Sequence, residues 1–163
     1  PPMKSVKLQQ VEKALLELYP SLYRLAYSYV HNPDDAMDIV QDSAYKAILR
    51  AEDVKNQETI KSWLCRIVVN TSLDALRKKR KESTGLENIP DAGKEDAYED
   101  LDVLRALEGL DERERTVVTL RYFEDMKLSE IVNVTGENLS TVKSILYRSL
   151  KKLKVTLAEG ESI

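Results

Sequence analysis

A helix, turn and helix pattern near the carboxyl end constrains the fold of this chain more than any other feature. Gly136 stands between two apolar stretches, where a sharp turn between helices needs a permissive backbone. Ser140 and Thr141 are typical caps or first-turn residues for the second helix. Its buried face is predicted by helical spacing to consist of Leu139, Val142, Leu146 and Leu150. The pattern predicts a helix-turn-helix over residues 128–154.

Two separated basic segments accompany this pattern. After Ser140 the charged residues that precede Glu159 are all cations, and residues 77–81 read Arg-Lys-Lys-Arg-Lys. A solvated lysine face, or cations that complement a helix dipole, would explain either segment alone. Five consecutive cations are more than a helix dipole requires, because neighbouring like charges repel one another. The two segments therefore indicate two contacts on one long polyanion such as duplex nucleic acid.

Acidic residues are concentrated between the basic segments. Residues 82–102 hold eight acids and one base, a net charge of −7, whereas the rest of the chain holds 24 bases and 20 acids. Gly85, Pro90 and Gly93 punctuate this stretch, and its hydrophobic periodicity is weak before Tyr98. We expect two small, mildly basic domains, over 4–82 and 98–158, joined by an acidic flexible linker over 83–97.

The periodicity is helical throughout, because no run of β-branched residues alternates convincingly and Gly and Pro number only five each. It predicts an all-α protein with early helices over about 8–30, 33–50 and 59–81, the first of them broken or restarted at Pro20. Asn32 provides a cap for the second helix. In the second half, a helix over 98–107 is followed by a capping-box pattern at Asp111 and Glu114.

The helix expected over residues 59–81 has two different faces. Trp63 shares one face with Ile60 and Ile67, which favours core packing over base stacking. The opposite face carries polar side chains spaced by three or four residues, namely Arg66, Asn70, Asp74, Arg77 and Lys81. Such a stripe offers groups for both bases and phosphates.

Composition argues against several classes of protein. The single Cys65 excludes a disulfide framework and fits a reducing compartment. No apolar run approaches the ~18 residues of a membrane span, so we expect a cytoplasmic protein that does not insert into a membrane. His31 stands alone, and neither a Gly-rich phosphate loop nor a nucleophile with its base is present. We expect no metal, no cofactor, no small-molecule substrate and no enzymatic activity.

Three segments carry recognisable motifs. They read LYRLAYSYVHNPDDAMDIVQDSAYKAILRA, then SWLCRIVVNTSLDALRKKRK, then LDERERTVVTLRYFEDMKLSEIV followed by STVKSILYRSLKKLK. In this order and spacing they resemble the extracytoplasmic function (ECF) sigma factors, two-domain initiation subunits of bacterial RNA polymerase. The resemblance covers nearly the whole chain.

The resemblance implies that one acidic helix docks on the large subunit of core RNA polymerase. The matching positions are Asp35, Asp38, Ile39, Gln41 and Asp42. An exposed acidic helix face suits a basic partner and steers association. From the residues alone, a solvated helix start whose acids favour the dipole is an equal interpretation.

The resemblance also implies that the first domain captures an unstacked base of the minus-10 promoter element. An Asn amide suits a base edge because it offers both donors and an acceptor. A loop at about residues 52–58 would form the other wall of the pocket. The matching positions are Asn70, Thr71, Asp74, Arg77, Lys78 and Arg80.

The second domain would read the minus-35 element in the major groove. Arg and Lys suit guanine edges, while Ser suits a base or a phosphate. The matching positions are Thr141, Lys143, Ser144, Tyr147, Arg148 and Lys151.

The chain departs from the family pattern around the turn. Thr135 and Glu137 replace apolar residues, Val132 replaces a small residue, and Ile145 replaces a frequent Arg. These departures bear on how tightly the two helices pack. An exposed Ile145 would be available for a protein partner.

We therefore expect an alternative sigma factor that binds core RNA polymerase and promoter DNA under the control of an anti-sigma factor, commonly membrane-anchored in this family. The alternative is a helix-turn-helix regulator that binds duplex operator DNA without polymerase. Such regulators are usually dimers, and the sequence has no heptad pattern or separate dimerisation helix. A pure interaction protein would leave both basic segments unexplained.

Overall fold

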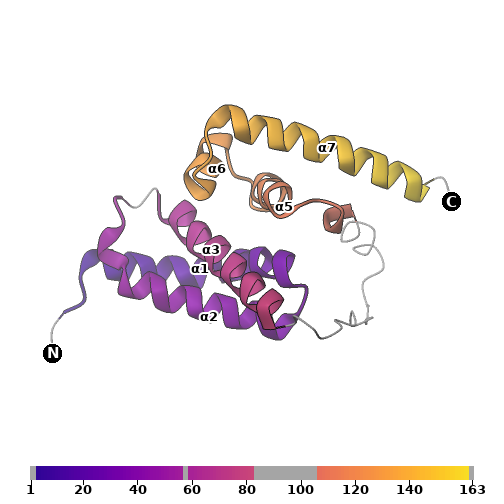
Figure 1. Ribbon diagram of the computed structural model, residues 1–163. Helices are drawn as coiled ribbons and strands as arrows, with labels where there is room; N and C mark the ends of the chain where they lie inside the picture. The colour runs from indigo at the N-terminus through magenta and orange to yellow at the C-terminus, as the bar shows by residue number, and fades with distance from the viewer. Residues whose placement is uncertain (1–2, 57–58, 83–105, 162–163) are drawn as a thin grey trace.

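The computed structural model describes residues 3–56, 59–82 and 106–161, and every regular element in these ranges is helical (Figure 1). This confirms the predicted all-α class. The first group of elements comprises α1 (Val6–Val30), α2 (Pro33–Leu49), η1 (Ala51–Asp53) and α3 (Ile60–Glu82). The second group comprises α5 (Glu112–Val118), η3 (Thr119–Phe123), α6 (Leu128–Thr135) and α7 (Leu139–Glu161). The expected linker over 83–97 lies outside the described residues, as does all of the expected 98–107 helix except residues 106 and 107, which are helical.

Helix α1 passes through Pro20 without a break, so the expected interruption was wrong. Pro20 has no N–H to bond the carbonyl of Leu16, but Leu16 is 81% exposed and water can satisfy that carbonyl. Ser5 caps the start of the helix, since its hydroxyl accepts the N–H of Leu8 at 3.0 Å. His31 ends the helix in the left-handed conformation, with φ of 53°.

Two predicted helix starts are confirmed. The Asn32 side chain accepts the N–H of Asp35 at 2.9 Å, and Pro33 is the first residue of α2. Asp111 and Glu114 form the expected capping box at the start of α5. Both caps satisfy backbone N–H groups that have no partner within the helix.

The helix-turn-helix is also confirmed, with a different cap. Gly136 ends α6 with φ of 77°, where only a residue without Cβ is unstrained. Asn138 caps α7, because its side chain accepts the N–H of Thr141 at 2.8 Å, and Ser140 and Thr141 take the other predicted role, as first-turn residues. The Ser140 hydroxyl in turn donates to Asn138 at 3.0 Å.

A π turn, η3, connects α5 to the loop before α6. In it the N–H of Glu124 bonds to the carbonyl of Thr119 at 3.0 Å, one residue wider than in an α-helix. Asp125 follows with φ of 55°. This turn directs the Glu124 side chain into the contact between the two groups of helices, where it is buried.

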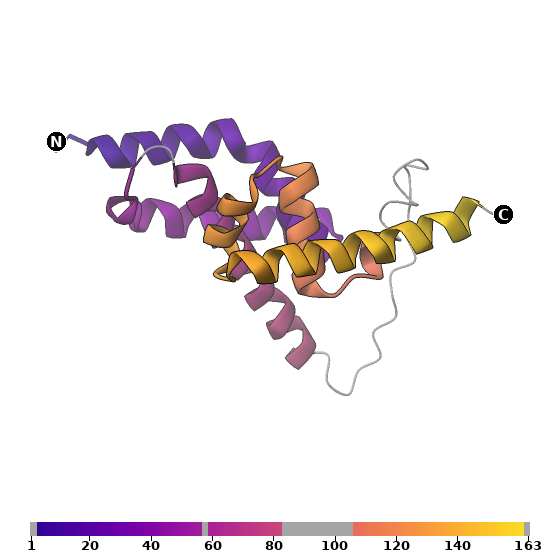
Figure 2. The ribbon, with the colours of Figure 1, turned by 90° about the horizontal axis from the view of Figure 1, so that it is seen from above.

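One hydrophobic core joins the two groups. Leu25, Leu64 and Val68 are buried in the first group, and the same cluster continues through Ile131 and Val134 in the second. Helix α3 packs against α1, α2 and α6, and Figures 1 and 2 show α7 on the far side of this contact from α2. None of the described helices is long and apolar enough to cross a membrane.

Candidate nucleic-acid and protein interfaces

The exposed face of α7 brings together most of the residues predicted to read the minus-35 element. They line a shallow surface groove of about 570 Å³. Thr141 lies one turn earlier and is half-buried. The residues that line the groove are Lys143, Ser144, Tyr147, Arg148 and Lys151.

The buried face of α7 is rotated from the predicted one. Val142 is buried as expected, but Leu139 and Leu150 are exposed, whereas Ile145 and Ser149 are buried. Ile145 is only 2% exposed and packs in the shared core, so the expectation that it is available to a partner was wrong. The Ser149 hydroxyl is satisfied by the Ile145 carbonyl at 2.6 Å, which permits a small polar residue at a close helix contact.

The recognition face is tied to α5 by a buried carboxylate. Glu114 accepts hydrogen bonds from Arg148 Nε at 2.7 Å and from Lys152 Nζ at 2.9 Å. Burial alone would raise the pKa of Glu114, but these two bonds and one from the Asp111 N–H lower it to about 2. The ionised carboxylate also raises the pKa of the Arg148 guanidinium. Sequence analysis found Glu114 only as a cap, because no local pattern indicates a contact 34 residues away.

The basic end of α3 carries cations that are partly paired with acids. Arg77 bonds Asp74 at 2.9 Å within the helix. Arg80 bonds Glu112 of α5 at 2.8 Å, a contact between the two groups of helices. These side chains are about two-thirds exposed, so their ion pairs are weak and can be exchanged for phosphate.

Asn70 lies on the side of α3 that faces the second group. It lines a cavity of about 250 Å³ together with Arg77, and the opposite wall includes Thr116 and Val134. The part of the expected loop that the structure describes, residues 52–56, does not line this cavity. In this arrangement the second group forms a wall opposite Asn70.

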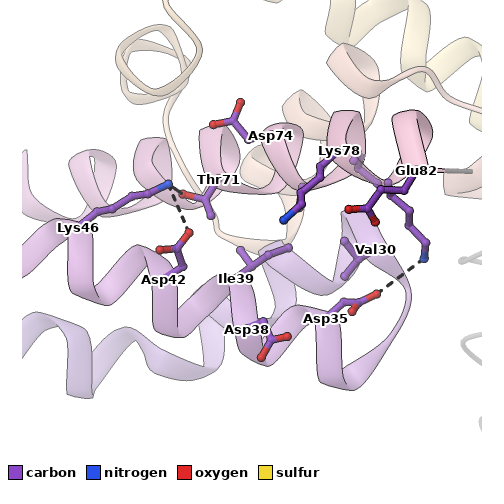
Figure 3. A pocket seen from close by; sticks show the side chains of 13 residues that line it. Val30, Asp35, Asp38, Ile39, Asp42, Lys46, Thr71, Asp74, Lys78 and Glu82 are labelled. Atoms are coloured by element: carbon purple, nitrogen blue, oxygen red, sulfur yellow. Dashed lines mark hydrogen bonds and ion pairs between the residues drawn. The ribbon is translucent and has the colours of Figure 1, made fainter.

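Thr71 lies on the other side of α3, toward α2, and is only 5% exposed. Its hydroxyl accepts a hydrogen bond from Lys46 Nζ at 3.0 Å (Figure 3). Neighbouring positions on a helix differ by about 100°, so Thr71 cannot share the face of Asn70. The predicted minus-10 residues therefore divide between two surfaces, and Asp74 and Lys78 line the α2 side with Thr71.

A groove of about 620 Å³ between α2 and α3 contains most of the residues predicted to dock on polymerase (Figure 3). Asp35, Asp38 and Asp42 line it, and Ile39 is 4% exposed at its base. Cations of α2 and α3 also reach these acids, since Lys79 lies 3.8 Å from Asp35 and Lys46 lies 3.5 Å from Asp42. Gln41 is exposed on the same helix outside the groove.

Two exposed apolar residues of α2 were missed by sequence analysis. Tyr45 and Leu49 are both about two-thirds exposed. They follow Asp38 and Asp42 at helical spacing, which was the available signal. The exposed side of α2 is therefore acidic at its start and apolar at its end.

The remaining chemistry of the described residues is structural. Cys65 is buried, and its burial, with Glu124 nearby, raises the pKa of its thiol to about 12, so it is unreactive. Trp63 packs against the core, as predicted. Within the described ranges no group of three or more His, Cys, Asp or Glu side chains could hold a metal ion.

Both halves of the chain match models of known protein families. The model of Sigma-70 region 2 matches residues 15–82, and the model of Sigma-70, region 4 matches residues 100–153. RNA polymerase sigma factor SigV of Bacillus subtilis is 47% identical over 96% of this chain and 99% of its own length. ECF RNA polymerase sigma factor SigM of Mycobacterium tuberculosis is 32% identical, over 81% of this chain and 69% of its own. This chain belongs to the ECF sigma factors.

A solved structure also resembles this ECF sigma factor across both groups of helices. The sigma factor RpoE from Bartonella quintana, crystallised with the anti-sigma factor NepR, has a TM-score of 0.76 and 24% identity. The match covers 90% of this chain and 96% of that one. Like its family, this ECF sigma factor is an alternative transcription initiation factor that binds core RNA polymerase and directs it to specific promoters.

Proposed function

We propose that the two halves of this ECF sigma factor divide promoter recognition. Residues 4–82 dock on core polymerase and capture the melted minus-10 element, residues 98–158 read the minus-35 element, and residues 83–97 link them. The observation that carries this proposal is the clustering of the predicted recognition residues on the exposed face of α7. The factor acts by binding, without catalysing a reaction of its own, and acts in the cytoplasm, where a bacterial chromosome lies.

In the minus-35 contact, Lys143 and Arg148 read base edges in the major groove, and Ser144 contacts a base or a phosphate. Tyr147 is exposed beside them and offers an apolar ring to a thymine methyl group. Lys151 at the end of the groove neutralises a phosphate, and Thr141, one turn before the groove, bonds another. Because much of the affinity is then electrostatic, binding by the isolated chain is weak and falls steeply with salt.

In the minus-10 contact, Asn70 bonds the edge of an unstacked base, while Arg77, Lys78 and Arg80 follow the phosphates. Asp74 orients Arg77, to which it is already bonded. Thr71 supports α3 from the α2 side through Lys46 rather than contacting the base. The second group forms a wall of the Asn70 cavity, but Asn70 is itself exposed, so a base can reach it beside that wall.

Docking on polymerase uses the exposed side of α2. Asp38 and Asp42 supply negative charge, and Tyr45 and Leu49 continue the same side with apolar surface. A basic helix with an apolar end would complement both parts. Gln41 adds a neutral hydrogen-bonding group between them, while the buried Ile39 fixes the position of α2 on the core.

An anti-sigma factor controls access to these surfaces in this proposal. The RpoE structure, which has the same fold, was solved with such an inhibitor. An inhibitor that covers the exposed Asn70 and occupies the α2 groove would block both base capture and polymerase docking. A membrane anchor on the inhibitor, rather than on this chain, would connect the system to an external signal.

The test is co-elution of the full chain with core RNA polymerase. An Asp38→Arg/Asp42→Arg variant should lose co-elution, because it reverses the charge of the docking side. A Glu17→Arg variant provides the control, since Glu17 is an exposed acid on α1 with only a 3.9 Å pair to Lys13. Retained co-elution of the double variant, or its loss in both variants, would contradict docking through α2.

A further inference from the structure

The Glu114 side chain has no exposed surface, yet it contacts two cations of the recognition helix. Its Oε2 accepts from Arg148 Nε at 2.7 Å, and its Oε1 accepts from Lys152 Nζ and from the Asp111 N–H, both at 2.9 Å. A buried carboxylate is costly unless its oxygens are satisfied. Here three bonds satisfy it, and two of them connect two charged groups, which makes them short and strong.

Arg148 is held by one edge of its guanidinium group. The bond from Nε uses one of five donors, and neither terminal nitrogen is bonded within the described part of the chain. A bidentate contact to the O6 and N7 atoms of guanine needs paired donors of this kind. The Arg148 side chain remains half exposed and lines the α7 groove with Lys143 and Ser144. A side chain that is already ordered loses less conformational entropy on binding.

We propose that Glu114 positions Arg148 for base reading and thereby sets the base specificity of the minus-35 contact without touching DNA. This inference rests on the proposed role of α7. Glu114 is suited to the task because α5 holds it through the Asp111 capping box, so its carboxylate is fixed before DNA binds. Lys152, one turn beyond Arg148, occupies the second oxygen and keeps the carboxylate ionised.

Glu114 also limits the attraction of α7 to DNA of any sequence. Together with Arg148 and Lys152 it forms a group with net charge +1 instead of +2. Each additional phosphate that a protein neutralises steepens the log-log dependence of affinity on salt by about 0.9. Removing the Glu114 charge should therefore strengthen binding to unrelated duplex while weakening discrimination between sequences. A residue that only stabilised the fold would change neither quantity in the folded protein.

The experiment uses holoenzyme reconstituted from the full chain and core polymerase. Duplexes are first selected from a random-sequence library by the wild-type holoenzyme, and affinity for a selected and a scrambled duplex is then measured at several salt concentrations. Glu114→Gln should lower the ratio of the two affinities about ten-fold and steepen the salt slope on the scrambled duplex by up to about 0.9. Glu108→Gln removes an exposed acid from the same half and should change neither.

Two results would overturn the proposal. The first is an unchanged affinity ratio and an unchanged salt slope for Glu114→Gln at a temperature where circular dichroism shows it folded. The second is an equal effect of Glu108→Gln, which would indicate general electrostatics. Arg148→Ala distinguishes failure of the positioning role from failure of the proposed base reading by α7. An unchanged affinity ratio in Arg148→Ala refutes base reading by Arg148. A lowered ratio in Arg148→Ala together with an unchanged ratio in Glu114→Gln refutes only the positioning role of Glu114.

Glu114→Asp provides a second test that does not depend on the folding of Glu114→Gln. It keeps the negative charge but shortens the side chain by one methylene, so that it cannot reach Arg148 and Lys152 as before. The affinity ratio should fall while the salt slope stays at the wild-type value. A wild-type ratio in this variant would count against positioning.

Discussion

Replacing Glu124 by Gln is expected to make the protein more stable at neutral pH. Glu124 is 2% exposed where η3 meets the first group, and neither carboxylate oxygen accepts a hydrogen bond in the described chain. Lys61 bonds the backbone carbonyl of Glu124, and half-exposed Arg24 lies 3.9 Å from its carboxylate. Burial raises the pKa of Glu124 above its ordinary 4.5, and Ser21 and Arg24 oppose this only in part.

The sign of the effect follows from linkage. A carboxyl whose pKa is raised by folding stabilises the fold in its protonated form, so its contribution is present below pH 4.5 and is lost as pH rises through the raised pKa. At pH 7, well above the ordinary pKa of 4.5, Glu124 is therefore destabilising. An unsatisfied buried polar group costs about 1–3 kcal/mol, and an unsatisfied charged group costs more. Glu124→Gln keeps the cost of a neutral buried group and removes the additional cost of the charge. Glu124→Gln also loses a weak attraction to Arg24. The net gain in the free energy of unfolding is then about 1 kcal/mol, or about 2–4 °C in Tm.

Thermal unfolding followed by circular dichroism at pH 7 and at lower pH would measure this gain. The advantage of Glu124→Gln should shrink as pH falls, because Glu124 then becomes protonated in the folded chain. Asp125→Asn, an exposed neighbour, should change stability by less than about 0.5 kcal/mol. A Glu124→Gln protein that is less stable at pH 7, or whose advantage grows in acid, would refute the reasoning.

Three further predictions concern stability. Burial would raise the pKa of Glu114, but Arg148 and Lys152 hold it at about 2; Glu114→Gln should therefore lose about 2 kcal/mol at pH 7, and its unfolding curve should converge with the wild-type curve as pH falls from about 4.5 to 2. In urea titrations, Asp125→Gly at φ of 55° should gain about 0.5–1 kcal/mol, whereas Gly136→Ala at φ of 77° should lose about 1 kcal/mol although its added Cβ meets no atom within 4 Å. Asn32→Ala should lose about 1 kcal/mol by the same measurement, because it removes the cap that accepts the Asp35 N–H.

Helix starts and the exposed face of α7 were predictable from the sequence because both depend on local chemistry. Asn32 and Asp111 cap helices through side chains that reach three residues along the chain. Gly136 marks the turn because few other residues adopt positive φ at low cost. Lys143 and Tyr147 share an exposed face as a consequence of helical spacing alone.

Long-range packing decided what the sequence could not predict. Leu150 is more apolar than Ser149, yet Ser149 is buried, because the position of α7 on the core selects the face and a carbonyl satisfies the hydroxyl. Glu114 is an acid in the first turn of a helix, a position that is usually exposed, and its burial depends on cations from α7. Pro20 is tolerated because its turn of α1 lies at the surface. No periodicity within either half indicates that the halves share a core.

The positions of the three candidate surfaces bear on the order of events at a promoter. Helices α2 and α7 lie on opposite sides of the contact between the two groups, and their grooves share no lining residue, so core polymerase and duplex DNA can each be engaged while the halves remain packed (Figure 1). Asn70 differs, because its cavity has the second group as a wall. Because Asn70 is itself exposed, this wall narrows the space beside its amide without covering it, so base capture does not by itself require the halves to separate.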